Sequence, residues 1–153
     1  MLNSYYTEKL LGLQGVEERN IQEKEKSYEI SIEQSGKVFI CPNCGEVTNK
    51  IHDYRYQRIK EVPVFEKKVI LVLRKRRYVC SCGKRFAEPN SFLTRYQRMS
   101  KRAIMSLLGK LSDSRSYSAV AREFNISTST VIRFFKNIDY SKPTKLPRGH
   151  WDR

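Results

Sequence analysis

The chain has 153 residues, enough for one ordinary domain or two small ones, and its 39% hydrophobic and 30% charged residues suit a soluble protein with a modest core. Its formal net charge is +14, and residues 55–102 carry fifteen bases against three acids. This concentration favours a polyanionic partner, nucleic acid or an anionic membrane, over a plain solvated surface. A run of about 18 apolar residues and a signal-peptide pattern are both absent, so we expect no transmembrane helix and a reducing cytoplasm.

The first 40 residues predict two strands. Residues 7–13 indicate a short helix ended by glycines, and residues 17–26 alternate in charge and indicate a solvated connector. Apolar and polar residues then alternate over 28–32, the period of a half-buried strand. After a turn signal at 34–36, a second strand is predicted at 38–40. We expect these two strands to form a hairpin.

The middle of the chain predicts further strands at 51–59, 64–65 and 69–73, with Pro63 as an interruption. The strand at 69–73 is the most apolar stretch of the sequence, and four basic residues follow it at once: Arg74, Lys75, Arg76 and Arg77. A strand that is apolar at one end and basic at the other can pack a small core and present charge beside it.

Two cysteine pairs, each followed by a glycine, bracket this basic segment. Cys41 and Cys44 form a CxxC-Gly motif, and Cys80 and Cys82 form a CxC-Gly motif that is one residue short of the usual pair. Four thiolates suit a closed tetrahedral zinc site, and a site with no open position is structural. Two disulfides do not fit a reducing compartment, and a redox CxxC would need no second pair. His52 could take the place of one cysteine as a ligand, so whether it binds the metal stays an open question at this point.

From Ser100 onward the apolar period becomes helical. Four leucine or isoleucine residues recur at i, i+3, i+4 and i+7, and Ser100 is placed to cap the helix: Ile104, Leu107, Leu108 and Leu111. Two shorter helices are predicted over 118–124 and 128–137.

These two short helices fit a helix-turn-helix. The motif needs a small residue where the helices cross and a residue that tolerates a left-handed φ at the turn, and Ala121 and Asn125 stand at those positions. Apolar residues are placed to lock the helices together: Val120, Phe124, Ile126, Val131 and Phe134. A plain helical hairpin has the same apolar spacing, but the charge and the cysteine pairs favour DNA binding.

The candidate DNA contacts fall into two groups. Hydroxyls at the start of the second helix suit phosphates or bases, and an arginine on the same face can bind guanine; this group is Ser127, Thr128, Ser129, Arg133 and Lys136. The second group is expected to contact phosphates irrespective of sequence: Arg74, Lys75, Arg76, Arg77, Lys84 and Arg85.

Several stretches in order resemble the N-terminal half of bacterial transposases of the ISL3 family, from about residue 7 to 146. They are Tyr-Thr-Glu-Lys-Leu-Leu-Gly-Leu near the start, Cys-Pro-Asn-Cys-Gly, His-Asp-Tyr-Arg, the Val-Pro pair 62–63, Arg-Arg-Tyr-Val-Cys-Ser-Cys-Gly-Lys-Arg-Phe, and the helix-turn-helix. The resemblance implies a zinc ribbon and a helix-turn-helix that bind the terminal inverted repeats of the element. The short CxC spacing is acceptable within that family.

The resemblance ends before the RNase H-like domain, with its Asp/Asp/Glu metal site, into which such transposases continue. Here residues 146–147 are followed by Arg-Gly-His-Trp-Asp-Arg. We therefore expect a truncated transposase, either from a frameshift or as a separate DNA-binding product, that is not itself an enzyme. The expected fold is α+β: a lead-in at 1–33 with a short helix and strand, a β-rich zinc ribbon at 34–92, an all-α helix-turn-helix domain at 98–139 and an irregular tail at 140–153.

Double-stranded DNA is the expected partner, with full-length transposase or a second copy of the chain as further partners and no membrane. Such a protein would associate with the bacterial nucleoid when bound. Two other functions use the same residues. The chain could be a free-standing regulator that represses or competes with transposition at the same ends. It could also be an RNA-binding zinc ribbon in which Tyr54 and Tyr56 stack on bases.

Overall fold

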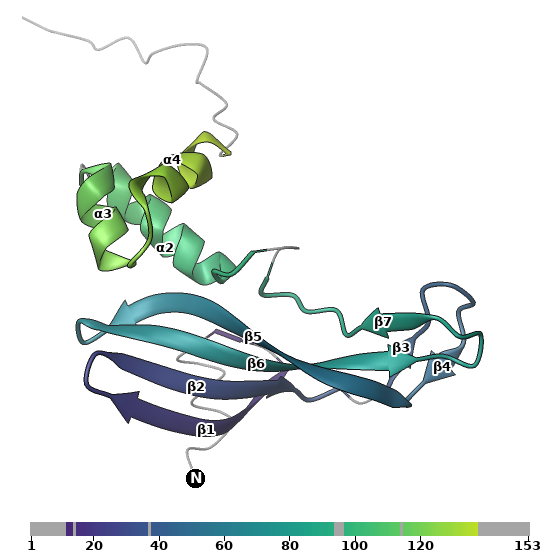
Figure 1. Ribbon diagram of the computed structural model, residues 1–153. Helices are drawn as coiled ribbons and strands as arrows, with labels where there is room; N and C mark the ends of the chain where they lie inside the picture. Colours follow the sequence, from purple (N-terminus) through teal and green to yellow (C-terminus); the bar gives the residue numbers. More distant parts are fainter. Residues whose placement is uncertain (1–11, 14, 37, 94–96, 114, 138–153) are drawn as a thin grey trace, which may run out of the picture.

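The computed structural model describes residues 12–13, 15–36, 38–93, 97–113 and 115–137 (Figure 1). The predicted helix at 7–13 and the predicted tail at 140–153 fall wholly or mostly outside these ranges. The fold is mixed α+β, with a β-rich first part and three helices after it, in agreement with the expected class. The helices are α2 (Lys101–Ser112), α3 (Tyr117–Glu123) and α4 (Thr128–Lys136). The described helices include none long and apolar enough to cross a lipid bilayer.

A twisted sheet forms the body of the protein, with the strand order β1-β2-β6-β5 and with β7 also paired to β6. Its strands are β1 (Val16–Lys24), β2 (Ser27–Gln34), β5 (Ile51–Val64), β6 (Lys67–Val79) and β7 (Arg85–Ala87). Strands β2 and β6 run parallel, and the other pairs are antiparallel. A separate two-stranded sheet joins β3 (Phe39–Ile40) to β4 (Val47–Thr48).

Two expectations about the N-terminal segment are wrong. The predicted strands at 28–32 and 38–40 exist but do not form a hairpin, because β2 pairs with β1 and β6 while β3 pairs with β4. Residues 17–26 are no connector, since most of them lie in β1. Strand β1 is an edge strand whose side chains are mostly exposed, and backbone hydrogen bonds to β2 hold it in place. It therefore lacks the alternating apolar pattern that identifies a half-buried strand. The expected boundary at residue 33 falls inside β2, so residues of the predicted lead-in and of the predicted ribbon share one sheet.

Strands β5 and β6 form the longest pair, and both exceed the predicted lengths. Pro63 does not interrupt β5, which continues to Val64. Because β5 is an edge strand and its register with β6 shifts between Glu61 and Val64, the missing N–H of the proline removes no regular ladder bond. Strand β6 likewise runs straight through the basic run to Val79.

Two hydrophobic cores lie along this pair. The first fills one face of the sheet near the start of β6 and is formed by Leu13, Val16, Ile30, Ile32, Ile59, Val69, Leu71, Leu73, Phe92 and Leu93. The second holds the three helices together and is formed by Met99, Ala103, Leu107, Val120, Ala121, Phe124 and Val131.

The helices dock on the free edge of β5, as Figure 1 shows. The amide of Lys60 donates to the carbonyl of Arg98 (2.8 Å), and the amide of Ser100 donates to the carbonyl of Lys60 (3.0 Å). The next residue, Glu61, has a fully buried side chain and accepts a hydrogen bond from the Arg102 guanidinium at 3.1 Å. Val62 then packs against the helical core. The connection is therefore made by backbone, ionic and apolar contacts within three residues of β5.

The turn between β5 and β6 predicts a simple stabilising change. Phe65 and Glu66 both have positive φ (49° and 63°), a conformation that costs a residue other than glycine about 1 kcal/mol or more, and the Phe65 ring is 86% exposed. Replacing the two residues with Asn-Gly should therefore raise the free energy of unfolding by about 1 kcal/mol, measured by urea denaturation. Ala-Ala at the same positions should give no such gain, and equal gains from both variants would show that the turn conformation is not the cause.

Candidate metal centre and nucleic-acid interface

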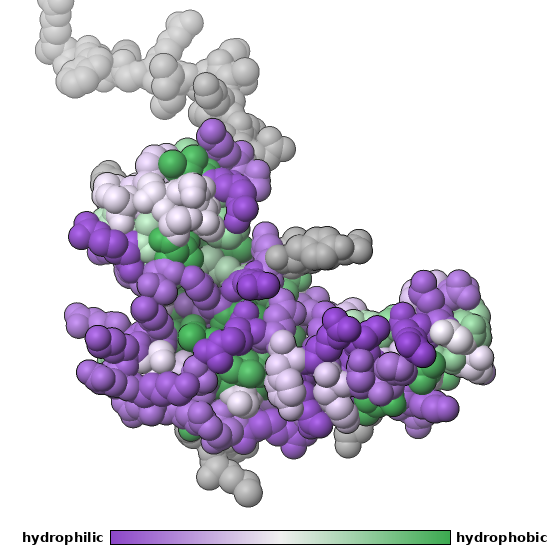
Figure 2. Space-filling view, viewed as in Figure 1, coloured by the Kyte–Doolittle hydropathy of each residue, from purple (hydrophilic) through white to green (hydrophobic). Residues whose placement is uncertain are grey.

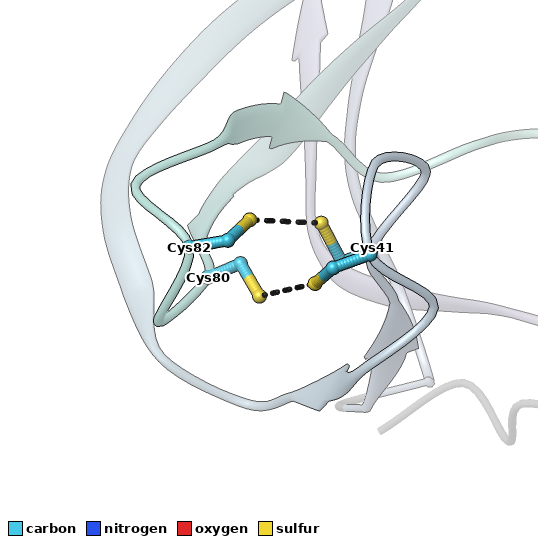
Figure 3. Close-up of side chains that lie close together, drawn as sticks. Cys41, Cys80 and Cys82 are labelled. Carbon is cyan, nitrogen blue, oxygen red and sulfur yellow. Dashed lines mark hydrogen bonds between the residues drawn. The ribbon is translucent and has the colours of Figure 1, made fainter.

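The four cysteines converge at the end of the sheet that lies far from the helices (Figures 1 and 3). Their sulfur atoms all lie within 4.8 Å of one another, with Cys41 and Cys82 Sγ 3.7 Å apart and Cys44 and Cys80 Sγ 3.4 Å apart. A tetrahedral zinc ion with Zn–S bonds of about 2.3 Å requires sulfur separations of about 3.8 Å. The sulfurs thus already have the spacing of a four-thiolate zinc site, and the predicted cofactor fits it.

The backbone explains why a CxC motif can match a CxxC motif. In the first loop the amide of Gly45 donates to the carbonyl of Cys41, and the amide of Cys41 donates to the carbonyl of Glu46. In the second loop the amide of Gly83 donates to the carbonyl of Cys80, and the amide of Cys80 donates to the carbonyl of Lys84. Each hydrogen bond of the second loop spans one residue fewer than the corresponding hydrogen bond of the first loop. Both glycines adopt left-handed φ values of 75° and 82°, which lets each loop turn tightly beneath its sulfurs.

The two exposed cysteines of the cluster, Cys44 and Cys82, differ in acidity. The Lys84 amide and the Cys44 thiol donate to Cys82, which lowers the pKa of Cys82 to about 7. For Cys44 the Glu46 amide acts in the lowering direction, but the neighbouring Cys80 and Cys82 sulfurs outweigh it and raise the pKa to about 12. The Cys82 thiol therefore ionises more easily than a free cysteine, and the Cys44 thiol less easily. A divalent ion would allow all four to ionise.

His52 stands apart from this site. It is an exposed residue of β5, and its Nδ1 lies 3.5 Å from the Asp53 carboxylate. The group of four side chains that could share a metal consists of cysteines alone, so His52 takes the place of none of them.

Zinc content tests the site directly. Native mass spectrometry should find one zinc ion per chain, and Cys41→Ser or Cys82→Ser should abolish it, whereas Ser81→Ala, between two of the ligands, should retain it. Chelation should speed amide exchange in β3, β4 and β7 and leave α2 protected, because the large sheet and the helices have cores of their own. A protein that binds no zinc, or that exchanges identically after chelation, would contradict the assignment.

The predicted basic run does not form one surface, because successive side chains of a strand point to opposite faces. Arg74 and Arg76 lie on one face of β6, and Lys75 and Arg77 lie on the other. The Arg74 guanidinium stacks on the Tyr54 ring, 3.8 Å from its centroid, and Arg77 pairs with Asp53 at 3.0 Å. Lys84 and Arg85 are exposed at the start of β7, beside the cysteines.

The predicted phosphate contact of Arg76 is wrong, because its side chain is only 6% exposed and cannot reach a phosphate. Its guanidinium lies 2.9 Å from Glu33 and 3.6 Å from Glu88, and it also donates to the Gly36 carbonyl. Both carboxylates are buried, and burial raises the pKa of Glu88 against the opposing effect of the Arg76 amide and charge. Arg76 therefore neutralises two internal acids and ties β2 and the segment after β7 to β6.

A stability measurement can separate this role from DNA binding. Arg76→Met should lower the free energy of unfolding by about 3 kcal/mol or more, because buried Glu88 loses its ion pair and Glu33 loses one of its three arginine partners. Lys75→Ala, one residue earlier and half-exposed, should change it by less than about 0.5 kcal/mol. If Arg76→Met unfolds the chain, the combination with Glu33→Leu and Glu88→Leu should restore a soluble fold. A mild effect, equal to that of Lys75→Ala, would contradict the structural role.

The helical unit has the features predicted for a helix-turn-helix. Ala121 is buried where α3 and α4 meet, with 3% exposure, and Asn125 has a φ of 51°. The Ser127 hydroxyl accepts a hydrogen bond from the amide of Thr130 and so caps α4, as Ser100 caps α2. The residues predicted to lock the helices are buried or packed against the core: Val120, Phe124, Ile126, Val131 and Phe134.

The candidate contacts on α4 lie on its solvent side. Ser127, Thr128, Ser129, Arg133 and Lys136 are all exposed. The hydroxyls of Ser127 and Ser129 hydrogen-bond to each other, whereas the amide cap is made by Ser127 alone. The opposite side of the helix carries Val131, which is completely buried. The helix is thus divided into a core face and a polar face.

Comparison with known proteins gives matches for both parts of the chain. Residues 37–83 match the family model described as the zinc-finger of transposase IS204/IS1001/IS1096/IS1165, and residues 88–138 match that of the helix-turn-helix domain of transposase family ISL3. The transposase for insertion sequence element IS1001 from Bordetella parapertussis is 31% identical over 135 residues, which cover 86% of this chain and 33% of that protein. No solved structure matches the chain significantly.

Proposed function

We propose that this chain, which belongs to the ISL3 family of transposases, binds double-stranded DNA and recognises the terminal inverted repeats of an insertion sequence. The observation that carries the proposal is the division of α4 into a buried face and a face of exposed hydroxyls and cations. A recognition helix must leave its polar side free while its apolar side is held by the rest of the domain.

The polar face of α4 suits the major groove. Thr128 and Ser129 occupy its first turn, where backbone amides and the helix dipole favour a phosphate. Arg133 lies one turn further along on the exposed side and has no carboxylate within ion-pair distance among the described residues. A guanidinium that is not held by a carboxylate can bind the O6 and N7 atoms of guanine.

The ribbon adds contacts of a different kind. Lys84 and Arg85 are exposed beside the cysteine cluster, and the loop that carries them is closed by backbone hydrogen bonds to Cys80. Zinc would hold this loop in place, so two cations would reach a phosphate backbone without first being ordered. We therefore assign sequence recognition to α4 and sequence-independent affinity to the ribbon.

This division predicts different consequences for two substitutions. Sequences bound by the wild-type protein are first selected from a random duplex library. On the selected sequence, Arg133→Ala should cost about 1–3 kcal/mol of binding free energy and relax the preference at one base position. Lys84→Ala should weaken binding to all sequences alike and reduce the salt dependence by about one phosphate contact.

Lys26→Ala serves as the control, because Lys26 is an exposed cation in the β1–β2 turn, far along the chain from both surfaces. It should leave the sequence preference unchanged. Equal effects of Arg133→Ala and Lys84→Ala on every sequence would contradict the recognition-helix assignment, and a wild-type protein that binds no duplex would overturn the function itself.

A further inference from the structure

Between the cysteine end of the ribbon and the helices, the sheet carries an open hollow of about 610 Å³ lined by four cations: Arg55, Lys75, Arg77 and Arg98. They come from three separate segments. Arg55 is in β5, Lys75 and Arg77 are in β6, and Arg98 precedes α2. Arg55 and Arg98 lie 20 and more residues from Lys75 in the sequence, and only the fold brings them to it.

The charges in this hollow are poorly compensated within the protein. Arg55 and Lys75 are direct cross-strand partners in the register of β5 and β6, and like charges at such positions repel. Of the four cations, only Arg77 makes an ion pair with a described residue, namely Asp53. Lys75 interacts with Glu88 through charge alone, and the Glu88 carboxylate already forms an ion pair with Arg76.

Arg98 is held in place by backbone contacts that do not depend on its side chain. Its carbonyl accepts a hydrogen bond from the amide of Lys60, and the side chain of Gln57 donates to the carbonyl of Gln97 at 3.1 Å. The segment that docks the helices on β5 therefore also brings a cation to the rim of the hollow. Hydrophilic residues cover most of the face of the sheet seen in Figure 2, and smaller hydrophobic patches lie among them.

The position of the hollow along the strands matches the geometry of duplex DNA. The helices dock at Lys60, which is opposite Ile70 of β6, and β6 reaches the cysteine end of the ribbon at Cys80. Ten residues of strand span about 33 Å, with the hollow near the middle. One turn of B-DNA measures about 34 Å. A duplex that contacts the helical unit and the ribbon on one side would therefore carry its phosphates past the hollow.

We propose that this hollow binds the phosphate backbone of duplex DNA between the segments contacted by the helix-turn-helix and by the ribbon. The inference rests on the proposed DNA binding and adds a third contact surface to it. Phosphate oxygens would supply the negative charge that Arg55, Lys75 and Arg98 lack, and the surface would contribute affinity without sequence preference.

The salt dependence of binding tests this surface. The probe is a random-sequence duplex about three helical turns long, and the variant is Arg55→Ala with Arg98→Ala. Each lost phosphate contact should reduce the slope of log K against log salt by about 0.9, so the double variant should lose about 2 from the slope. The matched control is Lys24→Ala with Lys26→Ala, which removes two exposed cations of the β1–β2 hairpin.

The outcomes separate the two proposals. A smaller slope in the Arg55/Arg98 variant alone, with its zinc content and thermal unfolding unchanged, supports the hollow as a backbone site. An unchanged slope, or an equal reduction in the Lys24/Lys26 control, overturns the hollow but leaves the proposed function standing. If the wild-type protein does not bind the duplex, the proposed function itself is wrong. If the Arg55/Arg98 variant loses structure, Lys75→Ala gives the same test with an expected loss of about 1 in slope.

Discussion

The antiparallel pairing of β5 with β6 is the constraint on which the rest of the structure depends. Its free edge at Lys60 receives the helical unit, and its other end delivers Cys80 to the metal site. Between these points the backbone forms a nearly continuous hydrogen-bonded ladder from Asp53 to Glu61. Two modules that could have been joined by a loose linker are instead fixed to one pair of strands. Their separation is then set by strand length.

The strand pair also sorts the charge of the chain. In an unstructured segment the four basic residues would form one patch. Because side chains alternate along β6, Arg74 and Arg76 lie on one face and Lys75 and Arg77 lie on the other. On the first face Glu33 of β2 neutralises Arg76. On the second face Arg55 is added to the cations and little acid is present. Glu33 therefore does more than balance net charge, because it compensates the cations on one side of the sheet and leaves those on the other side uncompensated.

Features that depend on residues close together in the sequence could be predicted, and features that depend on distant residues could not. The cysteine ligands, the Ser100 and Ser127 caps and the left-handed Asn125 depend on a few neighbouring residues, and all were found from spacing and residue type. The pairing of β2 with β6 joins residues about 40 positions apart and left no local signal, so a hairpin was predicted in its place. Strand β1 was missed because an exposed edge strand has no apolar period.

The same reasoning explains the one residue whose predicted contact the structure contradicts. Arg76 is surrounded in sequence by cations that remain accessible, and only the register and the buried Glu33 and Glu88 distinguish it from them. A burial pattern of period two through the run would have separated Arg76 from Lys75, but four consecutive basic residues hide that period. Charge composition can therefore predict that a segment meets a polyanion, whereas the choice of residues that meet it needs the face assignment.

The fixed spacing has a consequence for affinity as well as for geometry. When two weak contact surfaces are joined by a flexible linker, binding through both requires the linker to be ordered, and the second contact is favoured only through its effective concentration. Here backbone hydrogen bonds at Lys60 and at Cys80 have already placed the surfaces during folding. The ordering cost is then part of protein stability, and little remains to oppose association. The same arrangement penalises any DNA that cannot present its backbone to both ends and to the hollow between them, so the strand pair would contribute to discrimination by DNA shape even where no side chain contacts a base.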